Sequence, residues 1–169
     1  MFRVTALLVS AAFALAACAP EPPQLGPDGR PLPQVYRIGP KDAEVIPMRV
    51  AEAVNSLRSV RGTAPVTLNS QLTAAATAHS QDMSAQNRAW HWGSDGSSPL
   101  DRAMRAGFGG KVLGENISET YETEIETLSA WMSVYDTRDV LLNPEASQIG
   151  FGWYQEPSGK IWWTLVSGR

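Results

Sequence analysis

The number of cysteines is the feature that most limits how this chain can fold. Cys18 is the only cysteine among the 169 residues, so the chain cannot form an intramolecular disulfide or a zinc site built from several thiolates. Its stability must therefore come from a packed hydrophobic core. The composition allows one, because 43% of the residues are hydrophobic, 18% are charged and six are tryptophan. At this length we expect one domain.

The N-terminal residues that lead to Cys18 follow the order of a secretory signal. Arg3 is followed by an apolar run over residues 4–17, which ends in the small residues Ala16 and Ala17. The run is too short to span a bilayer with ease. We therefore expect residues 1–17 to form a signal peptide that is removed on export.

The sequence Leu15-Ala16-Ala17-Cys18 resembles a bacterial lipobox. This resemblance implies that Cys18 is acylated, with palmitate or related chains, and anchors the protein to a membrane. Two or more acyl chains anchor stably, whereas one anchors only marginally. Ala19 after the cysteine, rather than aspartate, implies the outer membrane, facing the periplasm. The alternative is ordinary signal-peptidase cleavage after Ala16, which leaves Cys18 as a plain thiol.

Proline dominates the region after the cysteine. Seven of the twelve prolines lie between Pro20 and Pro40, and such a stretch favours extended polyproline backbone and buries no core. We expect residues 18–42 to be the lipidated cysteine followed by a linker. Either a disordered terminus or a spacer from a membrane fits this composition.

Residues 43–169 carry the periodicity of a folded α+β domain whose first helix begins near Pro47. Helical faces alternate with short apolar strands, and Pro157-Ser158-Gly159 provides a hairpin turn. The expected architecture is a three-layer α-β-α sandwich around a small, mainly antiparallel sheet. The patterns predict helices at about 47–61, 69–89, 101–106 and 122–142, the last broken near 135–137, and strands at 112–118, 148–155 and 160–167.

Seven short phrases, in order, resemble the CAP superfamily, also called SCP-like, in its bacterial branch. Together they cover roughly residues 47–167. They are Asn55-x-x-Arg58, Leu72-x-x-Ala75-Ala76-x-x-His79-x-x-Asp82-Met83, His91-x-Gly93-Ser94-Asp95-Gly96-Ser97-Ser98, Gly114-Glu115-Asn116-Ile117, Trp131-Met132-x(5)-Arg138, Leu141-Leu142-Asn143-Pro144 and Ile149-Gly150-x-Gly152.

The resemblance implies a cleft that is lined, in many members, by two histidines and two glutamates. The first histidine matches His91 and the first glutamate matches Glu115, whereas the second glutamate falls on Val134 and the second histidine on Thr137. A zinc site needs three or four protein ligands, so we predict no metal or other cofactor unless a third ligand joins His91 and Glu115. Asp136 is the candidate for that ligand, although a solvated charge is the simpler interpretation.

Other side chains admit a structural and a functional interpretation. His79 lies on an apolar helical face, which favours a core histidine bonded to backbone. Serines 94, 97 and 98 sit in a Gly/Ser-rich turn, where backbone capping is the commoner role, and no nucleophile elbow is present. The pair His91 and Glu115 can join a loop to a strand or bind a ligand. Tryptophans 90 and 92 flank His91 and either pack the domain or form an aromatic wall for a ligand.

These observations lead to one expected function and two alternatives. The net charge of −3 and the absence of a Lys/Arg stripe exclude nucleic acid as a natural partner. We expect a membrane-anchored envelope lipoprotein that binds a lipid, cell-wall or protein ligand at the cleft around His91, Glu115, Thr137 and Asp136, with no catalytic residue. The alternatives are a metal-assisted hydrolase acting on peptide or cell wall, and a purely architectural docking domain.

Overall fold

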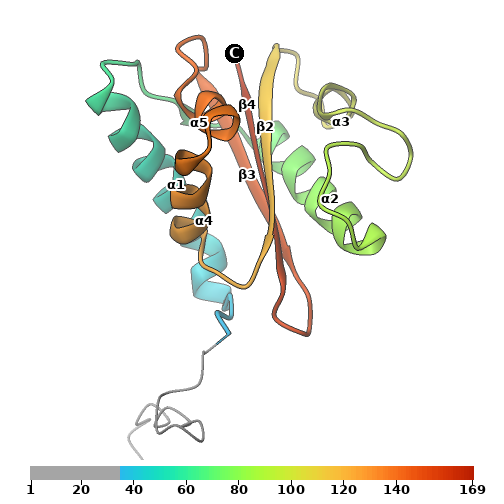
Figure 1. Cartoon of the computed structure of the whole chain (residues 1–169). Helices are drawn as coiled ribbons and strands as arrows, with labels where there is room; N and C mark the ends of the chain where they lie inside the picture. Colours follow the sequence, from blue (N-terminus) through green and yellow to red (C-terminus); the bar gives the residue numbers. More distant parts are fainter. Residues whose placement is uncertain (1–34) are drawn as a thin grey trace, which may run out of the picture. The chain divides into compact units, whose positions relative to one another are not determined.

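The computed structural model describes residues 35–169, and the expected signal peptide, Cys18 and most of the expected linker lie outside them. Residues 35–169 form a mixed α/β domain with five helices and four strands (Figure 1). None of the described helices is long and apolar enough to cross a membrane. The elements are α1 (Pro40–Val60), β1 (Thr67–Leu68), α2 (Ser70–Gln86), α3 (Pro99–Arg105), β2 (Val112–Thr120), α4 (Glu124–Ser133), α5 (Tyr135–Leu142), β3 (Gln148–Gln155) and β4 (Ile161–Gly168).

The four strands form one sheet in the order β1-β3-β4-β2. Only the two-residue β1 pairs in parallel, with β3, and the other pairings are antiparallel. Helices α1, α4 and α5 cover one face of the sheet, and α2 and α3 cover the other (Figure 1). The predicted α-β-α sandwich with a mainly antiparallel sheet is confirmed. β2 lies at the edge of the sheet and contacts α3.

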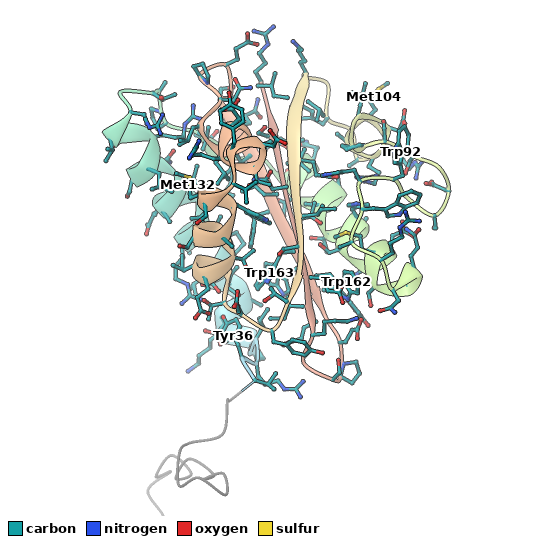
Figure 2. The ribbon with its side chains drawn as sticks, viewed as in Figure 1. Tyr36, Trp92, Met104, Met132, Trp162 and Trp163 are labelled. Carbon is teal, nitrogen blue, oxygen red and sulfur yellow. The ribbon has the colours of Figure 1, made fainter. Side chains whose placement is uncertain are left out.

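Alternation along β4 divides its side chains between the two faces. Trp163 and Leu165 pack among the apolar residues of α1 and α4, whereas Val166 packs against α2. Trp162 and Trp163 point to opposite sides of the sheet (Figure 2). On the α1 side, Phe151 stacks on Trp163 with ring centroids 5.4 Å apart, so tryptophans pack this core as expected.

Helix α2 lies directly against β3 because two glycines leave room for its backbone. A Cβ at Gly150 would collide with the backbone of Leu72 and Thr73, and one at Gly152 would collide with the backbone of Thr77. This close approach fixes the position of α2 over the sheet. It thereby places His79, two residues beyond Thr77 along α2, in the interior.

The start of the domain differs from the prediction. Helix α1 begins at Pro40 rather than near Pro47, because Pro40 occupies its first turn and the Asp42 carboxylate accepts the Gly39 N–H at 3.2 Å. Pro47 lies inside the helix instead of opening it. The compact unit extends back to Val35, so residues 35–42, assigned to the linker from their prolines, belong to the folded domain.

The side chain of Gln155 joins residues 36–38 to the end of β3. Its Oε1 accepts the Ile38 N–H at 3.0 Å, and its Nε2 donates to the Tyr36 carbonyl at 2.8 Å. Arg37 donates to the Pro157 carbonyl at 2.9 Å. We call these three contacts the Gln155 clamp. They secure an extended segment that makes no helical hydrogen bonds of its own.

Several other boundaries shift by one to three residues. α2 ends at Gln86 rather than 89, because Asn87 adopts a left-handed conformation with φ 49° that closes the helix. The predicted break in the fourth helical stretch is confirmed, but it falls at Val134, whose extended backbone separates α4 from α5. α3 starts at Pro99, two residues early, because Ser98 caps it.

Candidate functional site

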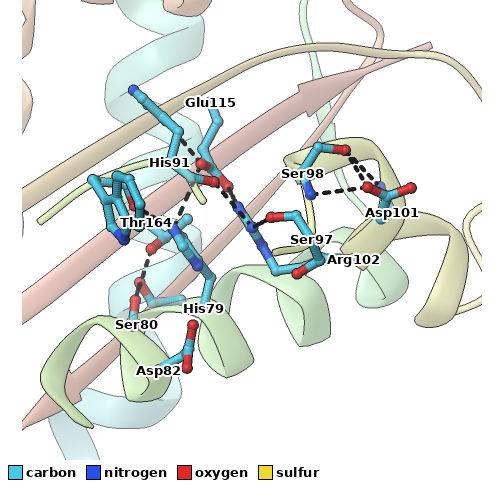
Figure 3. Close-up of polar contacts among 12 residues, drawn as sticks. His79, Ser80, Asp82, His91, Ser97, Ser98, Asp101, Arg102, Glu115 and Thr164 are labelled. Carbon is cyan, nitrogen blue, oxygen red and sulfur yellow. Dashed lines mark hydrogen bonds and ion pairs between the residues drawn. The ribbon is translucent and has the colours of Figure 1, made fainter. Parts of the chain in front are cut away.

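His91 and Glu115 meet on the α2–α3 side of the sheet (Figure 3). The His91 Nδ1 lies 2.9 Å from the Glu115 Oε1. The two side chains differ greatly in exposure, since 53% of the imidazole is accessible and only 2% of the glutamate side chain. The Glu115 carboxylate is therefore a buried hydrogen-bond partner of a histidine whose side chain is about half exposed.

Arg102 is the functional residue that sequence reasoning missed. Its Nη2 donates to the Glu115 Oε2 at 2.7 Å, and its Nη1 donates to the carbonyls of His91 (3.1 Å) and Ser97 (2.9 Å). The guanidinium thus holds both the carboxylate and the loop that carries His91. An arginine in a seven-residue helix looks like a surface charge, and no periodic or motif signal distinguishes Arg102 from Arg105.

His79 lies beneath this group and is fully buried. Its Nε2 is 2.9 Å from the Trp90 carbonyl, which confirms the predicted core histidine bonded to backbone. The same atom is 3.7 Å from the Glu115 Oε1. Burial lowers the pKa of His79, although the Glu115 carboxylate opposes that effect. His79 is therefore a neutral second imidazole close to the site.

The loop between Trp92 and Ser98 is held by its own polar groups. The Gly93 N–H donates to the Ser97 carbonyl at 2.9 Å, and Ser94 donates through its N–H and its hydroxyl to Asp82. Ser98 caps α3 through the Asp101 N–H. The expected backbone-capping role is confirmed for Ser98, whereas the Ser94 hydroxyl bonds the Asp82 side chain instead. Within residues 35–169 no serine hydroxyl forms a hydrogen bond with His91.

A cavity of about 370 Å³ opens beside the loop, between α2 and α3. Alanine methyl groups of α2 line its apolar part, and Asp82, Asp95, Arg102 and Arg105 contribute charge. Arg105 pairs with Asp95 at 2.8 Å. Hydrogen bonds from Ser97, together with Arg105, hold the pKa of Asp95 well below its usual range.

Thr137 and Asp136 do not join this group. Glu115 pairs across the sheet with Val166, whereas Asn116 pairs with Leu165 on the opposite face. The Asn116 Nδ2 donates to the Thr137 carbonyl at 2.8 Å, so Thr137 belongs to the α5 layer.

The hydroxyl of Thr137 has a structural role where the second family histidine would stand. It donates to the Trp131 carbonyl at 2.6 Å, across the break between α4 and α5. Asp136 is exposed, and no contact from it to His91 or Glu115 is recorded within residues 35–169. The structure therefore brings together two of the four cleft candidates, His91 and Glu115, and leaves the other two apart.

The donor set does not fit a protein-bound metal. Among residues 35–169 no group of three or more histidine, cysteine, aspartate or glutamate side chains is arranged so that it could hold a metal ion. Both oxygens of Glu115 are already bonded, one to Arg102 and one to His91. A zinc ion bound by both His91 and Glu115 would have to displace one of these bonds, and it would still have only two protein ligands.

Comparison with known proteins identifies the family. The model of the CAP family, described as the cysteine-rich secretory protein family, matches residues 51–167. The uncharacterized protein YkwD of Bacillus subtilis (strain 168) is 33% identical over 130 residues, which are 77% of this chain and 50% of that protein. The chain thus spans about half the length of this curated relative. The chain belongs to the CAP family.

Solved structures share the fold at low identity. An extracellular protein of Bacillus anthracis str. Ames that contains an SCP domain has a TM-score of 0.69 at 22% identity, over 79% of this chain and 45% of that one. An outer surface protein of Borrelia burgdorferi has a TM-score of 0.69 at 13% identity, over 80% of this chain and 98% of that one. Both support the α-β-α sandwich assignment.

Proposed function

We propose that this CAP domain is a non-catalytic binding module of the bacterial envelope, and that the exposed side of His91 contacts its ligand or partner. The observation that carries this proposal is the bonding of Glu115. Its carboxylate is 2% exposed, and each oxygen has a protein partner. A carboxylate in that state orients a neighbour, and it is not free to act as a general base or a metal ligand.

The surface around His91 has the composition of a contact site. Trp92 is 52% exposed beside the half-exposed imidazole, and Met104 on α3 is 62% exposed. Both lie on the same side of the molecule (Figure 2). Large side chains of this kind are enriched at interfaces. His91 and Trp92, with Met104 on the same side of the molecule, therefore support binding of a sugar, lipid or protein group.

The anchored location remains part of the proposal. It is supported by the lipobox-like residues before Cys18, and the two structural relatives are described as an extracellular and an outer surface protein. The test is mass spectrometry of the mature protein from cells. A lipid-modified Cys18 at the N-terminus is expected, and an unmodified thiol at that position overturns the anchor.

Binding is tested by retention of the exported domain on isolated cell-wall sacculi and on phosphatidylethanolamine–phosphatidylglycerol vesicles. Retention on at least one of these should fall at least tenfold in His91→Ala and in Trp92→Ala. Val60→Ala is the matched control, because Val60 is 87% exposed at the end of α1 on the opposite layer. Equal retention of all variants contradicts the proposal and supports the architectural alternative.

The hydrolase alternative is tested by zinc titration calorimetry on the native domain. We expect no stoichiometric binding in the micromolar range. Tight binding of one zinc ion that is lost in Glu115→Gln would contradict the proposal, because it would require the carboxylate to leave Arg102 for a metal.

A further inference from the structure

The hydrogen bonds of Glu115 to Arg102 and His91 determine which nitrogen of the His91 imidazole carries the proton. Arg102 is always protonated and can only donate hydrogen bonds, so the Glu115 Oε2 at 2.7 Å is an acceptor. A carboxylate beside a guanidinium remains ionised and accepts at both oxygens. The hydrogen between the Glu115 Oε1 and the His91 Nδ1, 2.9 Å apart, therefore belongs to the imidazole.

We propose that Arg102, acting through Glu115, locks His91 in the tautomer that carries its proton on Nδ1, so that the exposed Nε2 presents a hydrogen-bond acceptor. Arg102 is thus a positioning residue rather than a contact residue. Its second bond, from Nη1 to the His91 carbonyl, fixes the backbone of the same histidine. The Arg102 guanidinium therefore sets both the position of the imidazole and the hydrogen-bonding character of its exposed Nε2.

The other charged or titratable groups near the His91 imidazole do not compete for the Nδ1 proton. His79, from α2, is buried and neutral, and its Nε2 faces the Trp90 carbonyl. A proton on that nitrogen satisfies the carbonyl. On α3, Arg105 pairs with Asp95 rather than with Glu115. The Oε1 of Glu115 is therefore left to accept from the His91 Nδ1.

An acceptor at the surface defines the chemistry of the ligand, given the proposed function of this face. Nε2 with a lone pair favours a hydroxyl, amide N–H or ammonium group. It disfavours a carboxylate or phosphate, which would meet a lone pair instead of a donor. The adjacent Trp92 provides a face for the apolar body of the same ligand. A hydroxyl- or amide-bearing ligand is therefore expected, in preference to an anionic group.

The test is a ¹⁵N-resolved NMR measurement of imidazole tautomers at alkaline pH. The sequence contains only two histidines, so both ring patterns can be assigned with His79→Gln and His91→Gln variants. We expect a protonated Nδ1 and a bare Nε2 at His91. The opposite tautomer, or an equal mixture, overturns the proposal.

Glu115→Gln supplies the sharper test because it keeps the shape of the side chain. Arg102 still requires an acceptor, so the amide oxygen should face Arg102 and the amide NH₂ should face the His91 Nδ1. The His91 proton must then move to Nε2, and the tautomer inverts. The His79 pattern and the backbone amide spectrum serve as fold controls. An unchanged His91 tautomer in a folded variant contradicts the mechanism, and the wild-type measurement decides the matter if the variant does not fold.

The ligand class has its own readout in the sacculus and vesicle retention assay. His91→Gln presents a carbonyl oxygen and should keep part of the retention, whereas His91→Lys presents only donors and should lose it. Better retention by His91→Lys than by His91→Gln overturns the acceptor assignment. Loss of retention in His91→Ala together with the wrong tautomer would leave the proposed function standing while this inference fails.

Discussion

The two faces of the sheet are packed with different kinds of side chain. Thirteen buried apolar residues form the core between the sheet and the α1, α4 and α5 layer, including Trp131, Phe151 and Trp163. The apolar cluster on the α2–α3 side is smaller, with five buried members among residues 35–169. That side instead buries His79, Arg102 and Glu115 beneath the surface histidine. The apolar layer supplies stability, and the polar layer positions the site.

Trp163→Ala should have the largest effect on stability. Trp163 is fully buried and stacks on Phe151, so truncation leaves a large cavity in the apolar layer. We expect the free energy of unfolding to fall by about 3–5 kcal/mol, measured by urea denaturation. A loss below about 1 kcal/mol would contradict the view that this layer carries the stability.

Arg58→Met tests a buried polar side chain within the apolar layer. The buried Arg58 donates to four carbonyls, those of Ala64, Leu141, Asn143 and Ala146. Leaving them unpaired should cost about 2–4 kcal/mol in the same urea experiment. Arg61→Met, an exposed arginine at the end of the same helix, should change stability by about 0.5 kcal/mol or less.

Thr164→Val probes the polar layer. The hydroxyls of Ser80 and Thr164 are both buried and lie 2.8 Å apart. Removing one should cost about 1–2 kcal/mol, because the other loses its partner. The double variant Ser80→Ala/Thr164→Val should cost less than the two single changes added together. Simple additivity in thermal unfolding would show that the pair does not act as a unit.

The pH dependence of the free energy of unfolding should reflect the protonation of His79. Burial lowers its pKa in the folded state below the ordinary value of 6.5, so the unfolded chain binds more protons between the two values. Stability from this group is fully present above pH 6.5 and is lost as the pH falls from 6.5 toward the folded-state pKa. His79→Gln should flatten the change in urea midpoint between pH 7.5 and 5, and an unaltered slope would point to another group.

Trp92→Ala should have the smallest effect on stability. The side chain is about half exposed, so its removal should change the free energy of unfolding by about 0.5 kcal/mol or less, as checked by differential scanning calorimetry. A larger loss would mean that Trp92 packs the domain instead of forming part of the proposed contact surface.

The sequence predicted most of the fold because periodicity and turn residues report local structure directly. The hairpin of β3 and β4, the break near Val134 and the buried His79 all followed from local patterns. The first turn of α1 did not, because proline composition suggested a linker where Pro40 in fact opens a helix. Composition cannot distinguish these cases, since a proline suits both extended backbone and the first turn of a helix.

The site was predicted only in part, because its partners come from separate elements. His91 and Glu115 were identified by family resemblance, but the role of Arg102 depends on how α3 lies beside β2. The position of Thr137 was also invisible from sequence spacing. Alternation of β2 sends Glu115 and Asn116 to opposite faces, and only the observed pairing of β2 with β4 shows which helix each residue reaches.

The Gln155 clamp determines how the domain would respond to tension. A pull on the chain at Val35 would first load the bonds from Gln155 to Tyr36 and Ile38, which pass the force to β3 at the same time as α1 receives it. The strand hairpin and the helix would therefore share the strain, and α1 would not unwind alone from its first turn.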